Sequence, residues 1–121
     1  MAASVQAMSL VSGLKIVRDS ALSAVDADTV SGAATIYIIS IDNTANAATT
    51  VYVKLYNAAA PTLGTTAPDI IIPVIGGSTV KVIYTGGCAF ATALSIACTT
   101  TAGTAGTTAP ASGVAVAVTV G

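Results

Sequence analysis

The chain has 121 residues and a net charge of −1, from four lysines or arginines and five aspartates. Binding to nucleic acid needs clustered cations, which this chain lacks, so the charge balance excludes a nucleic-acid partner. The four cations are scattered: Lys15, Arg18, Lys54 and Lys81. Charged residues make up only 7% of the chain, against about 25% in an average soluble domain. Either threonine and serine solvate the surface, or neighbouring subunits cover much of it, and we favour the second.

The first twelve residues are small and apolar, with a period that fits neither a helix nor a strand clearly. They are expected to form either an N-terminal arm that lies against a neighbouring subunit or the first strand of the chain's own fold. The subunit-contact candidates in this segment are Val5, Met8, Leu10 and Val11. Residues 13–121 are predicted to form one β-sandwich domain. No basic residue precedes Lys15, so we expect no secretory signal.

Strands are predicted at residues 14–18, 34–41, 49–56, 70–75, 79–84, 89–97 and 114–120, with residues 21–30 as loop or weak strand. Hairpin turns are predicted at Gly76-Gly77 and Gly86-Gly87, and residues 42–46 carry turn chemistry. Pro73 places residues 70–75 at a sheet edge and interrupts the apolar run, so no membrane span is expected. The pattern predicts an all-β fold, an antiparallel β-sandwich or jelly roll of about seven to eight strands.

Alternation along these strands predicts which side chains form the core. The predicted core residues are Val51, Val53, Leu55, Phe90, Leu94 and Ile96, and the valines of residues 114–120 share one face. Tyr52, Lys54 and Tyr56 occupy the other face of residues 49–56. Lone lysines on strands usually face solvent, so we expect Lys54 and Lys81 to be exposed.

The two cysteines, Cys88 and Cys98, are predicted to be buried free thiols. If residues 88–98 form one strand, the Cα atoms of the two cysteines lie about 33 Å apart, whereas a disulfide needs about 5.5–6 Å. Free thiols are typical of proteins made in a reducing cytoplasm. The alternative is a bend near Ala93 that brings the two cysteines together.

The residues that usually perform catalysis are missing. There is no histidine and no glutamate, which excludes Ser-His-Asp and Cys-His sites and the usual zinc ligands. Asp26 and Asp28 could offer oxygens to calcium, but no further acid lies nearby to complete six to eight ligands, so we expect solvated loop aspartates. Four tyrosines are expected to form sheet or subunit contacts: Tyr37, Tyr52, Tyr56 and Tyr84. We expect no catalytic, cofactor or metal site.

Several segments resemble small virion structural proteins of tailed bacteriophages. The resemblance rests on residues 51–57 (VYVKLYN), 61–68 (PTLGTTAP), Gly86-Gly87 with residues 90–92, and residues 94–96, and it spans roughly residues 34–120. It implies a β-sandwich on a virion: a capsid cement or decoration protein, assembled in the host cytoplasm. Its partners would be the major capsid protein or other virion subunits, with the chain as a homo-oligomer or lattice member.

Two other functions remain open at this stage. Within the virion, the chain could be a tail, baseplate or fibre component instead. From another class, it could be a carbohydrate-binding β-sandwich module, although the absence of tryptophan disfavours a sugar platform. An enzyme is not expected.

Overall fold

The computed structural model describes residues 3–7, 13–23 and 25–121. That part of the chain forms nine strands: β1 (Ser4–Ala7), β2 (Lys15–Leu22), β3 (Val25–Val30), β4 (Ala34–Asp42), β5 (Val51–Tyr56), β6 (Ile70–Val74), β7 (Thr79–Phe90), β8 (Leu94–Thr99) and β9 (Val114–Val120). The predicted all-β antiparallel fold is confirmed, with nine strands instead of seven to eight. One source of the difference is residues 25–30, which form a strand. Within the described residues, no helix could cross a membrane.

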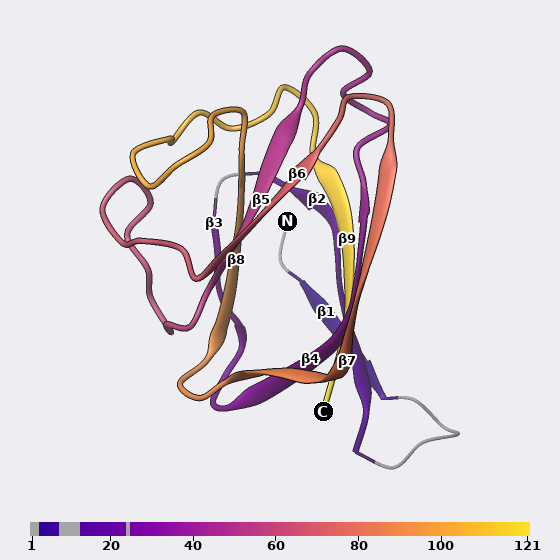
Figure 1. The fold of residues 1–121 in the computed structure, drawn as a ribbon, viewed down its shortest axis with the longest axis vertical. Coiled ribbons are helices and arrows are strands. Elements are labelled where there is room, and N and C mark those ends of the chain that lie inside the picture. Colours follow the sequence, from indigo (N-terminus) through magenta and orange to yellow (C-terminus); the bar gives the residue numbers. More distant parts are fainter. Residues whose placement is uncertain (1–2, 8–12, 24) are drawn as a thin grey trace.

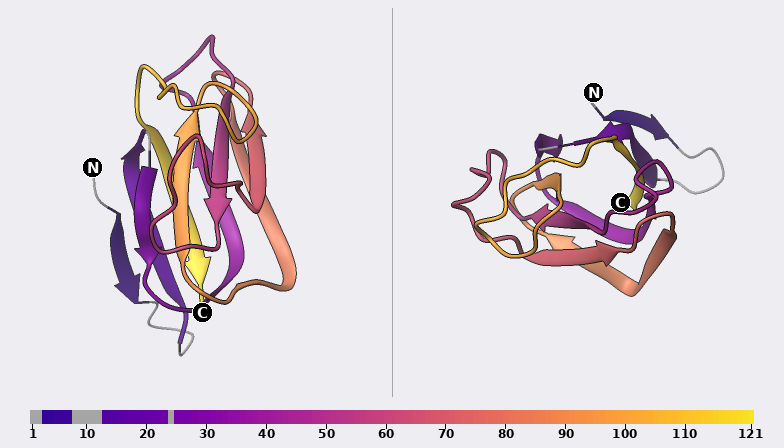
Figure 2. Two further views of the ribbon diagram at one scale, coloured as in Figure 1. Left: turned by 90° about the vertical axis from the view of Figure 1, so that its left-hand side faces the viewer. Right: turned by 90° about the horizontal axis from the view of Figure 1, so that it is seen from above.

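The strands form two sheets that face each other around a common interior (Figures 1 and 2). The five-stranded sheet has the order β1-β2-β9-β4-β7, and the four-stranded sheet has the order β3-β8-β5-β6. The antiparallel pairs β2–β9, β3–β8, β4–β7 and β5–β6 are nested along the chain. This connectivity is that of an eight-stranded jelly roll, to which β1 adds an edge strand beside β2.

The core lies between the two sheets. All six predicted core residues are at most 3% exposed, so this prediction is confirmed. The central strand β9 follows a strict two-residue period, in which its four valines are buried and the residues between them are half-buried. Because alternate side chains point to opposite faces, the small residues Ala115, Ala117 and Thr119 lie on the outer face of the five-stranded sheet.

The predicted two-residue turn at Gly76-Gly77 is present, with the Ser78 amide donating to the Ile75 carbonyl oxygen at 3.1 Å, but the predicted hairpin is wrong. This pair joins β6 in the four-stranded sheet to β7 in the five-stranded sheet. The backbone passes so close to residues 46–49 that a Cβ on Gly76 would lie 2.6 Å from the Thr49 nitrogen, and Gly77 has a φ of 78°. The glycines are therefore needed for close approach at a crossover between sheets.

The predicted turn at Gly86-Gly87 is also wrong. Both glycines lie inside β7, with φ angles of 83° and 88°. The pairing with β4 shifts at this point, because Ile36 pairs with Cys88 while Ile38 pairs with Ile83. The glycines belong to a β-bulge, which allows the long strand to bend without ending.

The two thiols are free, as predicted. The prediction rested on residues 88–98 forming one strand, and that premise is wrong. The chain bends at residues 91–93, so residues 88–98 do not form one strand. Cys88 lies on β7 in the five-stranded sheet and is half-buried, whereas Cys98 lies on β8 in the other sheet and is fully buried. Burial raises the pKa of Cys98 from 9.0 to about 12.

This shift predicts a loss of stability in alkali. The folded-state pKa of Cys98 lies above its unfolded value, so its contribution is complete below pH 9 and is lost as the pH rises to about 12. The free energy of unfolding, measured by urea titration, should fall across this window. The Cys98→Ala variant should be less stable at pH 8, yet show a flatter decline. An equally steep decline in that variant would contradict the assignment.

Candidate functional site

The chain's own loops cover much of the outer face of the four-stranded sheet. Its outward residues on β8, Ser95, Ala97 and Thr99, are all buried. The Ser95 hydroxyl donates to the Ala58 carbonyl oxygen at 2.6 Å, and Asn57 Oδ1 accepts from the Thr92 amide at 2.8 Å. Loop residues 57–69 and 99–113 thus lie over β8 and part of β5 on this face, whereas the outward residues of the edge strand β6, Ile71 and Pro73, stay exposed.

The outer face of the five-stranded sheet is bare by comparison. On four of its five strands, β2, β9, β4 and β7, every outward residue is half-buried or exposed. Ile16, Ile38 and Ile83 lie in one cross-strand row, in which Thr119 stands between Ile16 and Ile38. Ile83 is 65% exposed. We call Ile16, Ile38 and Ile83 the isoleucine row; such a row on an accessible sheet face is a ready surface for protein contact.

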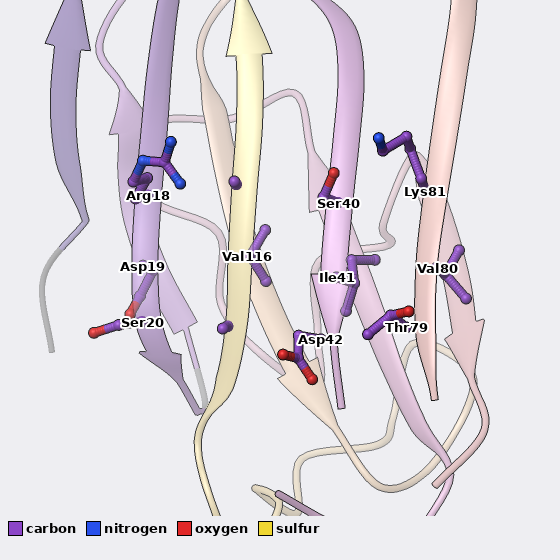
Figure 3. Close-up of a pocket in the computed structure, with 12 residues that line it drawn as sticks. Arg18, Asp19, Ser20, Ser40, Ile41, Asp42, Thr79, Val80, Lys81 and Val116 are labelled. Carbon is purple, nitrogen blue, oxygen red and sulfur yellow. The ribbon is translucent and has the colours of Figure 1, made fainter. Parts of the chain in front are cut away.

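A shallow trough of about 330 Å³ crosses the same face beside the isoleucine row (Figure 3). Three consecutive residues from each of four neighbouring strands line it: 18–20 on β2, 115–117 on β9, 40–42 on β4 and 79–81 on β7. The outward side chains over its centre, Ser40, Ala115 and Ala117, are small. The hollow therefore exists because the middle strands carry short side chains where the outer strands carry long ones.

Two cations stand at the ends of the trough. Arg18 and Lys81 are both exposed and lie in one register row with Ala117 and Ser40 between them. Three strand spacings separate β2 from β7, which places the two Cα atoms about 14 Å apart. As expected, Lys81 is exposed.

The trough also contains an aspartate that is held in place locally. Asp42 Oδ1 accepts hydrogen bonds from the Thr44 hydroxyl at 2.6 Å and from the Thr44 amide at 2.9 Å. These two bonds hold the pKa of Asp42 below its usual value, and the bond from the hydroxyl has the larger effect. The predicted turn at residues 42–46 is present, and the buried side-chain amide of Asn43 donates from it to the carbonyl oxygens of Thr49 and Val74.

The N-terminal contact candidates fall partly outside the described residues. Val5 lies on β1, pairs with Val17 of β2 and is 58% exposed. Residues 4–7 therefore form an edge strand of the five-stranded sheet. The other three candidates, Met8, Leu10 and Val11, lie outside the residues that the structure describes.

Lys54 contradicts the expectation that it faces solvent. Its side chain is fully buried on the outer face of β5, beneath the loop of residues 99–113. Its Nζ donates to the carbonyl oxygens of Gly103 at 2.7 Å and Gly106 at 3.0 Å. Burial lowers the pKa of Lys54. The ammonium group thus fastens to the sheet a loop whose bonded residues lie 49 and 52 positions further along the chain.

The four tyrosines do not gather into one surface. Tyr52 and Tyr56 lie on β5 in the four-stranded sheet, whereas Tyr37 and Tyr84 lie on β4 and β7 in the other sheet. Tyr56 is fully buried, and its hydroxyl has no hydrogen-bond partner among the described residues. Burial raises the pKa of Tyr56.

The possible metal ligands give no site in the described part of the chain. Asp26 and Asp28 lie in β3, so of the two expectations for residues 21–30, loop or weak strand, the strand is the one observed. Among the residues that the structure describes, no group of three or more histidine, cysteine or acidic side chains could hold a metal ion.

Replacing Lys54 with methionine should loosen the loop that Lys54 fastens. The Lys54→Met variant keeps the apolar stem but leaves the Gly103 and Gly106 carbonyl oxygens without their donor. We expect a loss of about 1–3 kcal/mol in urea unfolding, with faster amide exchange in residues 99–113. The exposed Lys81→Met control should stay within about 0.5 kcal/mol of the parent. Equal effects of the two substitutions would contradict the role of Lys54.

Replacing Tyr56 with phenylalanine should not destabilise the protein, in contrast to the Lys54 substitution. A buried hydroxyl without a partner costs about 1–3 kcal/mol, so Tyr56→Phe should leave stability unchanged or raise it by about 1 kcal/mol. The half-buried Tyr52→Phe variant is the control. A clear loss of stability in Tyr56→Phe would show that the hydroxyl is hydrogen-bonded.

Comparisons with protein-family models, with curated proteins and with solved structures found no match. The function therefore has to be inferred from the sequence and geometry of this chain. Loops cover much of one sheet face, and the other sheet face is open. On the open face, a trough with a cation at each end lies beside the isoleucine row.

Proposed function

We propose that this chain is a structural protein of a virion, a capsid cement protein that binds across neighbouring capsid subunits and stabilises the head. The observation that carries the proposal is the open outer face of the five-stranded sheet, where Ile83 is 65% exposed beside the trough. A protein that works by contact needs such a surface and no reactive side chains.

Three further observations support the same function. The motifs of residues 51–57, 61–68, 86–87, 90–92 and 94–96 resemble small virion proteins of tailed bacteriophages. The jelly-roll connectivity is shared by viral capsid domains, lectins and cupins, and this alone does not choose among them. The low charge content suits a protein whose surface is covered in an assembly.

The trough gives less support to a carbohydrate-binding module. Sugar rings stack on aromatic side chains, and no aromatic residue lines the trough. In the proposed role the isoleucine row contributes instead, because burial of each large apolar side chain stabilises an interface by about 1.5–3 kcal/mol before ordering costs.

The test uses particles that lack the chain and the purified full-length protein. The parent should bind at hundreds of copies per particle, as a capsid position requires. Ile83→Ser should weaken binding by at least about tenfold, because it removes apolar area from the proposed contact face. Ile75→Ser is the matched control, since Ile75 is 70% exposed but lies outside this face, between β6 and β7.

Each outcome of this experiment bears on the proposal. Both variants should unfold like the parent, because neither isoleucine is buried. Binding at a few copies or a few dozen copies would indicate a tail component instead of a cement protein. No binding to any particle would overturn the proposed function, and equal binding by Ile83→Ser and the parent would overturn the assignment of this face.

A further inference from the structure

The trough has a direction that limits what can lie in it. Its long axis crosses the strands, because it takes three consecutive residues from each of four neighbouring strands. The row Arg18–Ala117–Ser40–Lys81 follows this axis in register. Between the two end cations the outward side chains are only Ala117 and Ser40, so the backbone of a ligand could approach the sheet closely there.

The two cations of the trough favour anionic groups at its two ends. Of the four cations in the chain, Lys54 is buried, and Lys15 has the opposite parity to Arg18 along β2, so it points to the other side of the sheet. Arg18 and Lys81 are the remaining two, and both stand on this face. Two acids also line the trough: Asp19, which is buried, and Asp42, which lies outside the row of the two cations, in the neighbouring row with Ala115 and Thr79.

We propose that the trough binds an extended acidic segment of a neighbouring virion subunit, which lies across the strands with carboxylates at positions i and i+4. An extended chain advances about 3.3 Å per residue, so the roughly 14 Å between Arg18 and Lys81 spans about four residues. Residues at even spacing share one face of an extended chain, so both carboxylates can point towards the sheet. The residue at i+2 faces Ala117 and Ser40 and must be small.

A polypeptide fits this surface better than a sugar or a free anion does. The isoleucine row runs beside the trough and offers apolar contacts that a peptide side chain can use. The identity of the partner as a virion subunit rests on the proposed function, whereas the chemistry of the segment rests on the trough alone.

The experiment uses isotope-labelled full-length protein and a capped nine-residue peptide of alanine, serine and threonine, with glutamates at its third and seventh positions. Titration should shift the backbone amide signals of residues 18, 40, 81, 115 and 117. A peptide of the same composition with its two glutamates adjacent should bind at least about fivefold more weakly, because it reaches only one cation at a time. Binding should weaken as salt is raised.

Substitutions in the protein provide the matched controls. Arg18→Gln and Lys81→Gln should each weaken peptide binding about fivefold, and Ala117→Leu should abolish it by filling the trough. Lys15→Gln removes the same charge from the same strand on the opposite side, and it should bind like the parent. Equal binding of the two peptides, or no effect of Arg18→Gln and Lys81→Gln, would overturn the proposal.

Two further arms separate this inference from its alternatives. If sialic acid or inorganic phosphate shifts the same amide signals at lower concentration than the peptide does, the trough is a site for a small anion and the proposal fails. If the peptide binds as described but the protein binds no particle, the acidic-segment site stands and the proposed virion function falls. If particles bind Ala117→Leu as well as the parent, the particle does not use this trough.

Discussion

The two-residue period of β9 is the constraint on which the rest of the structure depends. This strand lies between β2 and β4 in the middle of the five-stranded sheet, and its four valines enter the core. The same alternation places Ala115 and Ala117 on the outer face, where they form the floor of the trough. A shift of one residue in register would expose the valines and lose the core and the trough together. The two-residue pattern of β9 therefore determines both the core and the outer surface of this sheet.

The two sheets differ in what covers them, and this difference leaves one face for partners. Loops of residues 57–69 and 99–113 fold back over the four-stranded sheet and are held there by polar contacts from Lys54, Asn57 and Ser95. Buried polar groups of this kind are stabilising only when they are paired, as Lys54 is by two carbonyl oxygens. The five-stranded sheet has no such cover over β2, β9, β4 and β7, whose outward residues all retain exposure.

Local patterns were enough to predict the fold class and the core, but not the site. Alternation identified β5 and β9, because every second residue of each strand is an aliphatic side chain that enters the core. The glycine pairs were predicted as hairpin turns, but one lies at a crossover and the other in a bulge. Sequence cannot separate these cases, because all three use the same conformational freedom of glycine. Lys54 was missed because the loop that buries it comes from a distant segment. The trough could not be predicted, because it arises from the register of four strands, in which Arg18 and Lys81 meet the small residues of β9.

The central claim is that the open face of the five-stranded sheet is the contact surface. Hydroxyl-radical footprinting of the chain, free and bound to its particle, tests it most directly because the method reports side-chain exposure residue by residue. The account predicts that Ile16, Ile38 and Ile83 are labelled more slowly in the bound chain, while Ile71 and Ile75 react as they do in the free protein. Unchanged labelling of the isoleucine row, together with protection of residues 57–69 and 99–113, would contradict it.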